Sequence, residues 1–463
     1  MLERWENQEE AYKFGLKHPA VMYDMDMGTG KTRVAIDLVY ARADCYRVLI
    51  VCPKSVVKDK VWKRNLEKFA PNQSYGYWDS MKGTISKRAE DLKEWLKTPM
   101  AKQFVVVNYD SVWRREMGDL ILKSNFNCVI LDESHRAKSA GSKVSKYLAM
   151  LGKRVKYKMC LSGTPMANSP LDVYGQYRFL DPTIFGTRYD LFEQQYAIKG
   201  GPDMKFVVGY KNQKELNTKF QSIAYSCKME DIRDKIKLPP ELPPTIRTVE
   251  LPSKDMKTMR ELAKEFVASC GTGQVVVSNV LVAMLRMQQI ASGFCVVKKD
   301  VFSAEEIETI NTAKADSLAE YLEDISPSSS VVVFCVFKHD LDVIRSVACK
   351  AKRKYFELSG RANTLEEWKQ TDGAVIGVQI QAGSEGVDMT KAHHAIYYSI
   401  PHSLAQYNQS KARLYRPGQE HPVSFCHIVA EGTIEESMYA SLERKEDIIE
   451  SIKAGTFDFG YKK

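Results

Sequence analysis

Short apolar runs alternate with helical stretches in both end thirds of the chain, and this alternation predicts an α/β fold. Strands of a parallel sheet that are buried on both faces are apolar at successive positions. Runs of this kind lie in the first third at 48–52, 104–107 and 128–131, and in the last third at 331–337, 374–378 and 395–398. We therefore expect two α/β lobes with parallel sheets, separated by a different middle section.

The section between about residues 181 and 311 has another pattern. Strand-like runs fade there, and helical spacing with aromatic residues replaces them. The proline-rich segment 238–244 cannot continue a helix and predicts a stiff connector. We divide the chain into a first lobe at 1–180, a helical insertion with its connector at 181–310, and a second lobe at 311–463 that ends in a brace helix opened by the capping sequence 433–436.

A glycine-rich turn follows the apolar residues 20–23 and precedes a predicted helix. Its residues are Met27, Gly28, Thr29, Gly30, Lys31 and Thr32. Glycines let backbone N–H groups close around phosphate oxygens, and a helix N-terminus adds partial positive charge. In such a loop the lysine reaches the β- and γ-phosphates, and the threonine hydroxyl holds Mg²⁺. Met25 replaces a further glycine of the general pattern, so the turn matches that pattern only in part.

A second segment strengthens the nucleotide interpretation. Asp132 and Glu133 follow the apolar run 128–131. Asp132 would hold the Mg²⁺ shell, and Glu133 would polarise the attacking water. Adjacent acids after a strand also occur in solvated turns, but their combination with the Lys31 turn favours hydrolysis of a nucleoside triphosphate.

Composition indicates a globular protein and argues against membrane-spanning, secreted and disulfide-stabilised classes. The 463 residues carry a net charge of +9 and are 44% hydrophobic and 27% charged, as in ordinary globular proteins. The longest apolar run, 331–337, is far shorter than the roughly 18 residues that cross a bilayer, and the charged first residues do not match a secretion signal. The ten cysteines form no CxxC pair, so we expect neither structural zinc nor disulfides.

The order of several motifs is similar to that in a known family. The glycine-rich turn and the acidic pair, with the Ser-Gly-Thr-Pro sequence at 162–165 and the run 409–419, resemble motifs of the superfamily-two helicase-like ATPases. The likeness is greatest to the Swi/Snf-type translocases on double-stranded DNA, and it extends over residues 8–452. It implies two RecA-like lobes that bind ATP and Mg²⁺.

The resemblance also assigns roles to individual residues. Gln8 matches a glutamine that reads adenine, and Gly386, Asp388 and Gln409 match nucleotide-site positions of later motifs. Segments that touch nucleic acid are matched by Pro53, Lys54, Asn108, Tyr109, Ala382 and Gly383. The 162–165 element resembles the one that links nucleotide state to DNA grip.

Arg413 and Arg416 match the two arginines of the sixth motif. A guanidinium of this kind approaches the γ-phosphate as charge builds in the transition state. Because these arginines lie on the second lobe and the phosphate loop on the first, hydrolysis would depend on closure of the two lobes. Closure and reopening would then move two DNA-gripping surfaces relative to each other.

Some positions depart from the family pattern. Ser226 and Cys227 stand where the insertion often carries an arginine pair, with Lys228 retained, and Ala412 replaces a usual glycine. Lys and Arg exceed Asp and Glu by four between Lys199 and Lys237. That excess suits phosphate contact and equally suits a solvated helical face.

We predict an ATP-dependent translocase on double-stranded DNA, monomeric when free, without membrane contact, and cytoplasmic in a bacterial or phage-infected cell. Two alternatives stay open. One is a strand-separating helicase on DNA or RNA. The other is a nucleotide-gated nucleic-acid-binding scaffold that does not hydrolyse ATP.

Overall fold

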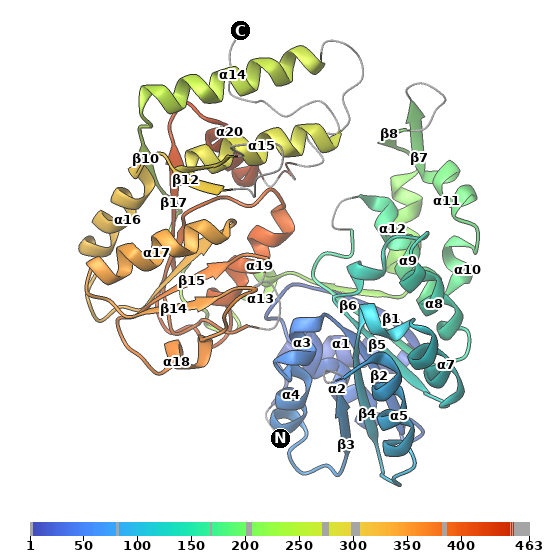
Figure 1. Cartoon of the computed structure of the whole chain (residues 1–463). Coiled ribbons are helices and arrows are strands. Elements are labelled where there is room, and N and C mark those ends of the chain that lie inside the picture. The colour runs from blue at the N-terminus through green and yellow to red at the C-terminus, as the bar shows by residue number, and fades with distance from the viewer. Residues whose placement is uncertain are drawn as a thin grey trace. The chain divides into compact units, whose positions relative to one another are not determined.

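The computed structural model describes residues 3–79, 83–166, 169–200, 206–270, 277–297, 306–381, 387–444, 446 and 448. The chain divides into two compact units, Met1–Lys237 and Leu238–Lys463, called unit 1 and unit 2 below (Figure 1). The range predicted as a helical insertion is shared between them. One short strand from it joins the sheet of unit 1, and another joins the sheet of unit 2.

Unit 1 is built on a seven-stranded sheet, and each strand pair described in it is parallel. The strands, in their order across the sheet, are β3 (Gly76–Asp79), β4 (Gln103–Asn108), β2 (Arg47–Cys52), β5 (Cys128–Asp132), β6 (Tyr157–Ser162), β1 (Ala20–Met25) and β9 (Ala224–Cys227). The predicted strands at 48–52, 104–107 and 128–131 are confirmed as β2, β4 and β5.

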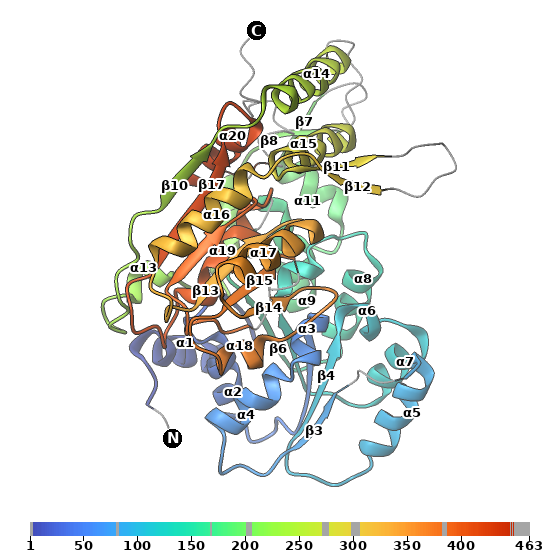
Figure 2. The same cartoon turned by 60° about the vertical axis from the view of Figure 1, so that its left-hand side comes forward.

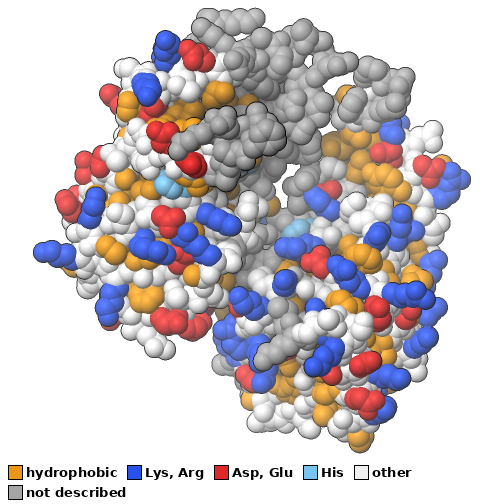
Figure 3. All heavy atoms as spheres, viewed as in Figure 1, with side chains coloured by type: hydrophobic (Ala, Val, Ile, Leu, Met, Phe, Trp, Pro, Cys, Tyr) orange, Lys and Arg blue, Asp and Glu red, His pale blue; other side chains and the backbone are white. Residues whose placement is uncertain are grey.

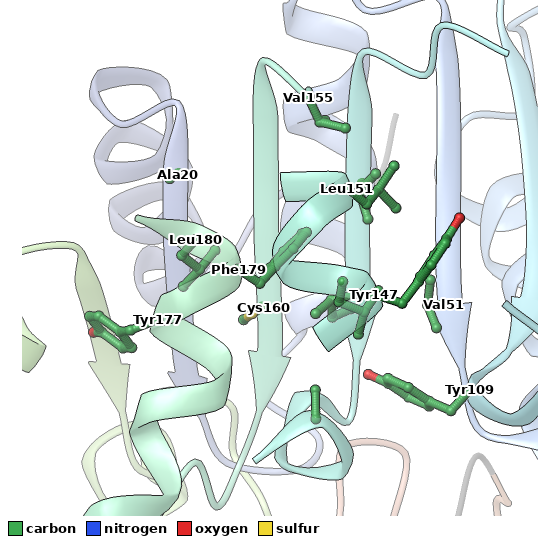
Figure 4. Packing of buried hydrophobic residues seen from close by; sticks show 14 of the residues in the cluster. Ala20, Val51, Tyr109, Tyr147, Leu151, Val155, Cys160, Tyr177, Phe179 and Leu180 are labelled. Carbon is green, nitrogen blue, oxygen red and sulfur yellow. The ribbon is translucent and has the colours of Figure 1, made fainter. Parts of the chain in front are cut away.

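Helices cover both faces of this sheet. One face packs against α1 (Glu6–Lys17), α2 (Lys31–Ala41), α3 (Lys54–Lys58) and α4 (Val61–Phe69). The other packs against α5 (Ile85–Trp95), α6 (Tyr109–Val112), α7 (Arg115–Lys123), α8 (Lys143–Gly152) and α9 (Val173–Leu180). Successive side chains of a strand point to opposite faces, so Leu49 and Val51 join the second cluster while Val48 and Ile50 join the first. Figure 4 shows Val51 near Tyr147 and Leu151 of α8.

A β-hairpin projects from the last part of unit 1 (Figure 1). It consists of β7 (Ala197–Gly200) and β8 (Phe206–Tyr210), which pair antiparallel. The neighbouring helices are α10 (Pro182–Phe185), α11 (Tyr189–Tyr196), α12 (Gln213–Gln221) and α13 (Met229–Ile232). Aromatic rings pack at its base: Phe192 lies 4.9 Å from Tyr174, 5.3 Å from Phe185 and 5.0 Å from Tyr196 between ring centroids. These ring contacts stabilise the base of the hairpin.

Unit 2 is built on a six-stranded sheet, again parallel in each described pair. The strand order is β10 (Thr245–Val249), β17 (Ser424–Ala430), β16 (His394–Tyr397), β13 (Val331–Cys335), β15 (Val375–Gln379) and β14 (Tyr355–Leu358). A separate antiparallel pair, β11 (Phe294–Val297) and β12 (Glu306–Thr309), projects to one side (Figure 2). The predicted strands of the last third are confirmed as β13, β15 and β16.

Helices also cover both faces of the second sheet. On one face lie α16 (Ala313–Asp324) and α17 (Lys338–Lys350) (Figure 2). On the other lie α18 (Leu365–Lys369), α19 (Leu404–Leu414) and α20 (Ile434–Glu443), while α14 (Ser253–Cys270) packs on α15 (Val277–Ala291). The helix α20 begins where the capping sequence predicts the brace helix, and its Met438 and Leu442 are buried. The further brace positions Ile449 and Ile452 lie outside the described residues. Both units therefore have the parallel-sheet α/β architecture of RecA-like lobes, as predicted.

Candidate active site

The glycine-rich turn of unit 1 joins the end of β1 to the start of α2. Gly28 has a φ of 85° and Gly30 a φ of 98°, a left-handed conformation that glycine adopts without steric cost. A Cβ on Gly30 would also lie 2.3 Å from Nε2 of Gln8. The hydroxyl of the buried Thr29 donates to the Asp26 carbonyl at 2.7 Å. The turn thus places the first amides of α2 where a phosphate group can bind them.

Gln8, which is predicted to read adenine, packs against this turn. Its side chain is buried, and its Nε2 donates to the Thr29 carbonyl at 3.4 Å. Asn7 donates to the same carbonyl at 3.1 Å from Nδ2. The sequence carries no signal for this contact of Asn7, because an asparagine near a helix start commonly serves as a cap.

Lys31 is the first residue of α2 and bonds to the turn itself. Its Nζ donates to the carbonyls of Met25 at 2.6 Å and Asp26 at 3.2 Å. Burial lowers the pKa of Lys31, whereas the carboxylates of Glu133 and Asp132 act to raise it. The lysine and the two acids of the second segment therefore meet in one place. Thr32 and Met27 flank this place and are half-buried.

The two acids lie at the carboxyl end of β5, which is separated from β1 by β6 alone. Ligands of parallel α/β sheets bind outside these strand ends. Oδ2 of Asp132 accepts a hydrogen bond from Nε1 of Trp62 at 2.9 Å, and this bond fixes the orientation of the carboxylate. Glu133 has a φ of 52° and a ψ of 55°. A non-glycine residue in this region is strained, and such residues cluster at active sites.

A chain of polar contacts runs from Glu133 to the 162–165 element. Oε2 of Glu133 lies 3.4 Å from Nδ1 of His135. The same nitrogen lies 3.3 Å from Oγ of Ser162, which in turn accepts a hydrogen bond from the amide of Thr164 at 3.1 Å. His135 therefore connects the acidic segment to the 162–165 element through polar contacts.

The residues predicted to touch nucleic acid differ in exposure. Lys54, at the start of α3, is exposed, whereas Pro53 before it is buried. Asn108 and Tyr109 are each only 5% exposed. Their side chains are used inside unit 1: Asn108 caps α6, and the hydroxyl of Tyr109 donates to the Asp132 carbonyl at 2.9 Å. The predicted Ala382 and Gly383 lie outside the described residues.

The predicted arginines of unit 2 lie at the end of α19. Arg413 is 2% exposed, whereas Arg416 is half-buried and donates from Nη1 to the Val387 carbonyl at 3.2 Å. Oδ1 of Asp388 accepts from the amide of Thr390 at 3.0 Å and from its hydroxyl at 2.9 Å. Burial would raise the pKa of Asp388, but the bonds from Thr390 and the charge of Arg416 hold it below its ordinary value. Unit 2 thus presents Arg416, rather than Arg413, beside Asp388.

Two further positions of unit 2 are predicted to belong to the nucleotide site. Gln409 lies on α19 and is half-buried, and Gly386 lies outside the described residues. Across the described part of the chain, no group of three or more His, Cys, Asp or Glu side chains is placed to hold a metal ion. No helix in that same part has the length and apolar character to cross a membrane.

Comparison with known proteins supports the interpretation of both units. Residues 2–293 match the SNF2-related domain, and residues 313–418 match the helicase conserved C-terminal domain. The chain is 24% identical to the human DNA annealing helicase and endonuclease ZRANB3, over 97% of this chain and 40% of that protein. It is 26% identical to an uncharacterized ATP-dependent helicase of Mycoplasma pneumoniae, over 96% of this chain and 41% of that protein.

A third relative is the DNA repair and recombination protein RAD54B of Gallus gallus, 24% identical over 93% of this chain and 51% of the relative. The chain therefore spans about two fifths to one half of the length of these relatives. The match to the SNF2-related domain alone extends over well more than half of the chain. On that match, together with the geometry of the phosphate turn and the acidic strand end, this chain belongs to the SNF2-related family.

Proposed function

We propose that this chain is an ATP-dependent translocase on double-stranded DNA. The observation that carries the proposal is the meeting of Lys31, Asp132 and Glu133 at one edge of the first sheet, beside a turn that can hold phosphates. The family match agrees with ATP use. Two relatives are named as DNA-acting proteins, which supports DNA as the partner.

The residues of unit 1 have separate roles in this proposal. Gln8 contacts the adenine, and Lys31 leaves the carbonyls of Met25 and Asp26 to bind the phosphates. Thr32 and Asp132 would hold Mg²⁺, which neutralises phosphate charge when bound. The donor set fits that ion, because Mg²⁺ prefers hydroxyl and carboxylate oxygens and Trp62 already orients the carboxylate. Glu133 accepts a proton from the attacking water and orients that water.

Unit 2 contributes a positive charge to the same reaction. Arg416 stabilises the negative charge that grows on the transferred phosphoryl group, an effect worth roughly 10³–10⁵ in rate. Arg416 belongs to unit 2 and the phosphate turn to unit 1, so hydrolysis requires the two units to approach each other. Each cycle of approach and release moves the nucleic-acid surfaces of the two units relative to each other, and this movement is the translocation step.

The preference for duplex DNA is tested by comparing how strongly different nucleic acids stimulate ATP hydrolysis. ATP turnover is measured without nucleic acid and with duplex DNA, single-stranded DNA or RNA. We expect duplex DNA to stimulate turnover most, and displacement of a triplex-forming strand to report movement along the duplex. Stimulation by RNA that equals or exceeds stimulation by DNA would contradict the substrate while leaving the ATPase intact.

Phosphate contacts also predict a strong dependence on salt. Lys and Arg side chains are interspersed with acids over the visible faces of both units (Figure 3). Raising salt from about 50 to about 200 mM should weaken duplex binding by orders of magnitude, because counterions released from phosphates oppose association. A flat response would require recognition of base edges or stacking instead.

A second candidate, strand separation, is favoured by the β7–β8 hairpin. Its side chains Ile198, Val207 and Val208 are 45%, 38% and 65% exposed. Apolar side chains presented in this way can wedge between base steps of a duplex. Unwinding of a forked duplex by the wild-type chain, lost in Val208→Ser with ATP turnover retained, would establish this activity. Absence of unwinding by the wild-type chain would leave translocation alone.

A further inference from the structure

The segment 226–229 lies against the phosphate turn, although about 200 residues separate the two in the chain. The strand β9 pairs with β1 so that Asp24 lies opposite Ser226 and Met25 opposite Cys227. The amide of Asp26, just beyond β1, donates to the Cys227 carbonyl at 3.0 Å. The last strand of unit 1 therefore reaches the first residue of the turn.

Side chains reinforce this contact with charge. Nζ of Lys228 lies 3.4 Å from Oδ1 of Asp24 and 3.4 Å from Oδ1 of Asp26. The other carboxylate oxygen of Asp24 accepts from the Ser226 hydroxyl at 3.1 Å. The other oxygen of Asp26 accepts from the amide of Met229 at 2.9 Å. One lysine thus faces two carboxylates, each held by a second bond from the same segment.

Asp26 connects these contacts to the lysine that binds phosphate. Its side chain is bound by Lys228 and Met229, while its carbonyl accepts hydrogen bonds from Lys31 at 3.2 Å and from the Thr29 hydroxyl at 2.7 Å. The position of the Asp26 peptide therefore sets the position that Lys31 takes before a nucleotide arrives. Burial lowers the pKa of Lys31, and the charges of Asp26 and Asp24 oppose that lowering.

The charge balance of this cluster depends on Lys228. Asp24 is only 9% exposed, and its pKa is raised by burial while Lys228 opposes that rise. Burial lowers the pKa of Lys228, but Asp24 and Asp26 more than offset this and raise it. Without the lysine, two carboxylates would remain beside the turn. They would repel the incoming triphosphate and would hold Lys31 on the turn more strongly.

We propose that Lys228 is a positioning residue for ATP binding, which neutralises Asp24 and Asp26 and keeps the turn and Lys31 ready for phosphate. The proposal rests on the proposed ATPase function. Ser226 and Cys227 stand where the insertion often carries an arginine pair, and Lys228 is the basic residue that remains beside them. The proposed role is that of this remaining residue.

The test is a charge-compensation experiment on the whole chain with duplex DNA present. Lys228→Met keeps the length of the side chain and removes its charge. The KM for ATP should rise about tenfold, which is a modest effect for a half-buried ion pair, while kcat changes by less than about twofold. Lys228→Arg should keep the wild-type KM. In the double variant Asp24→Asn with Lys228→Met, the loss of one carboxylate should restore most of the ATP affinity.

The matched control is Arg233→Met. This substitution removes one positive charge just beyond the segment, at the end of α13, but the Arg233 side chain is 49% exposed and faces Asp234 rather than the turn. It should leave KM unchanged. Direct binding of a fluorescent ATP analogue, measured beside thermal unfolding, separates a loss of affinity from a loss of folded protein.

Three outcomes would overturn the role of Lys228. They are a KM in Lys228→Met within about twofold of wild type, a rise in KM that Asp24→Asn does not reverse, and an equal rise in Arg233→Met. A wild-type chain that binds the analogue but does not hydrolyse ATP would instead contradict the proposed function. In that case the affinities of the same variants for the analogue still decide the role of Lys228.

Discussion

Units 1 and 2 share a parallel sheet covered on both faces by helices, yet their charged side chains are placed differently. In unit 1 the chemically important groups lie at the carboxyl edge of the sheet: Lys31 and Glu133 are near each other, and Glu133 has a strained backbone. In unit 2 the ion pair of Lys314 with Glu435 joins α16 to α20, and both side chains are fully buried. The ionised groups Lys31, Asp132 and Glu133 of unit 1 lie at a candidate ligand site, whereas Lys314 and Glu435 of unit 2 join two helices of that unit.

This difference separates what each unit can do. In the proposed function, unit 1 supplies the groups that bind phosphates, hold Mg²⁺ and activate water. Unit 2 contributes Arg416, which bonds only to the Val387 carbonyl among the hydrogen bonds described for its side chain. Nucleotide affinity should therefore depend on unit 1, and turnover should depend on both. Variants of each unit can test that division.

The largest effect is expected for Glu133→Gln in unit 1. The amide keeps the size of the side chain but cannot accept the proton of the attacking water. Turnover should fall by about 10³-fold or more, while binding of ATP persists. Lys31→Ala is the contrasting variant, because it removes a charge that faces the phosphates in the ground state and should lower both affinity and turnover. Near-normal turnover in Glu133→Gln would exclude this residue as the base.

A comparable effect is expected for Arg416→Ala, although it lies in the other unit. The nucleotide should still bind unit 1, and duplex DNA should still bind. Turnover should fall by roughly 10³-fold if the guanidinium stabilises charge in the transition state. Nucleotide affinity, DNA affinity and stimulated turnover are measured together. Normal turnover here would show that unit 2 takes no part in hydrolysis, and the proposed translocation step would fail.

The next effect concerns stability and should be confined to unit 2. Nζ of Lys314 lies 2.6 Å from Oε1 of Glu435 and donates to the Tyr398 carbonyl at 2.9 Å. Lys314→Met leaves Glu435 buried without its partner, which should cost about 3–5 kcal/mol. Hydrogen exchange should show lost protection in unit 2 and little change in unit 1.

The control for Lys314 is Arg444→Met, which removes a surface ion pair with Glu446 at 3.0 Å. Exposed pairs contribute about 0–1 kcal/mol, so this variant should be close to wild type. Equal destabilisation by the two variants would contradict the structural role assigned to the buried pair.

Much of the fold could be predicted because buried parallel strands have a distinctive sequence. Runs such as 128–131 and 331–335 are apolar at every position, and both became central strands. The edge strands β9 and β10 were missed for a physical reason. A short edge strand faces water on one side and carries polar residues such as Ser226 and Arg247, so it has no continuous apolar run.

The candidate site was predicted where one local segment carries the chemistry and missed where the partner is distant in sequence. Gly30, Lys31 and Asp132 belong to local patterns. Trp62 bonds to Asp132 across 70 residues, and in the sequence it is indistinguishable from any core tryptophan of an amphipathic helix. Lys228 is visible in the sequence as the basic residue that remains beside the missing arginine pair, but its contact with Asp26 depends on the register of β9 beside β1.

The smallest expected effect is a pH dependence of stability that is confined to unit 2 and depends on Asp340. This side chain is fully buried at the start of α17, where Oδ2 accepts from the Ser399 hydroxyl at 2.7 Å. Burial raises the pKa of Asp340 to about 7. The folded state thus retains a proton that an unfolded aspartate releases near pH 4. Its stabilising contribution is present at low pH and is lost as pH rises toward and through 7, by at most about 1.4 kcal/mol per pH unit.

Buried histidines of unit 2 act with the opposite sign, so the experiment must isolate Asp340. Burial lowers the pKa of His402 and of His394 to about 4, and that of His427 to about 3. Each of these histidines therefore reduces the stability of the fold as the pH falls below the ordinary pKa of histidine. Asp340→Asn leaves these histidines in place. As the pH rises from 5 to 8, wild type should therefore lose stability relative to Asp340→Asn, measured by the hydrogen exchange of unit 2 amides. The exchange of unit 1 amides should be the same in the two proteins. Parallel curves in unit 2 would show that Asp340 does not retain a proton in the fold, and a shift of equal size in unit 1 would show that the two units do not respond to pH independently.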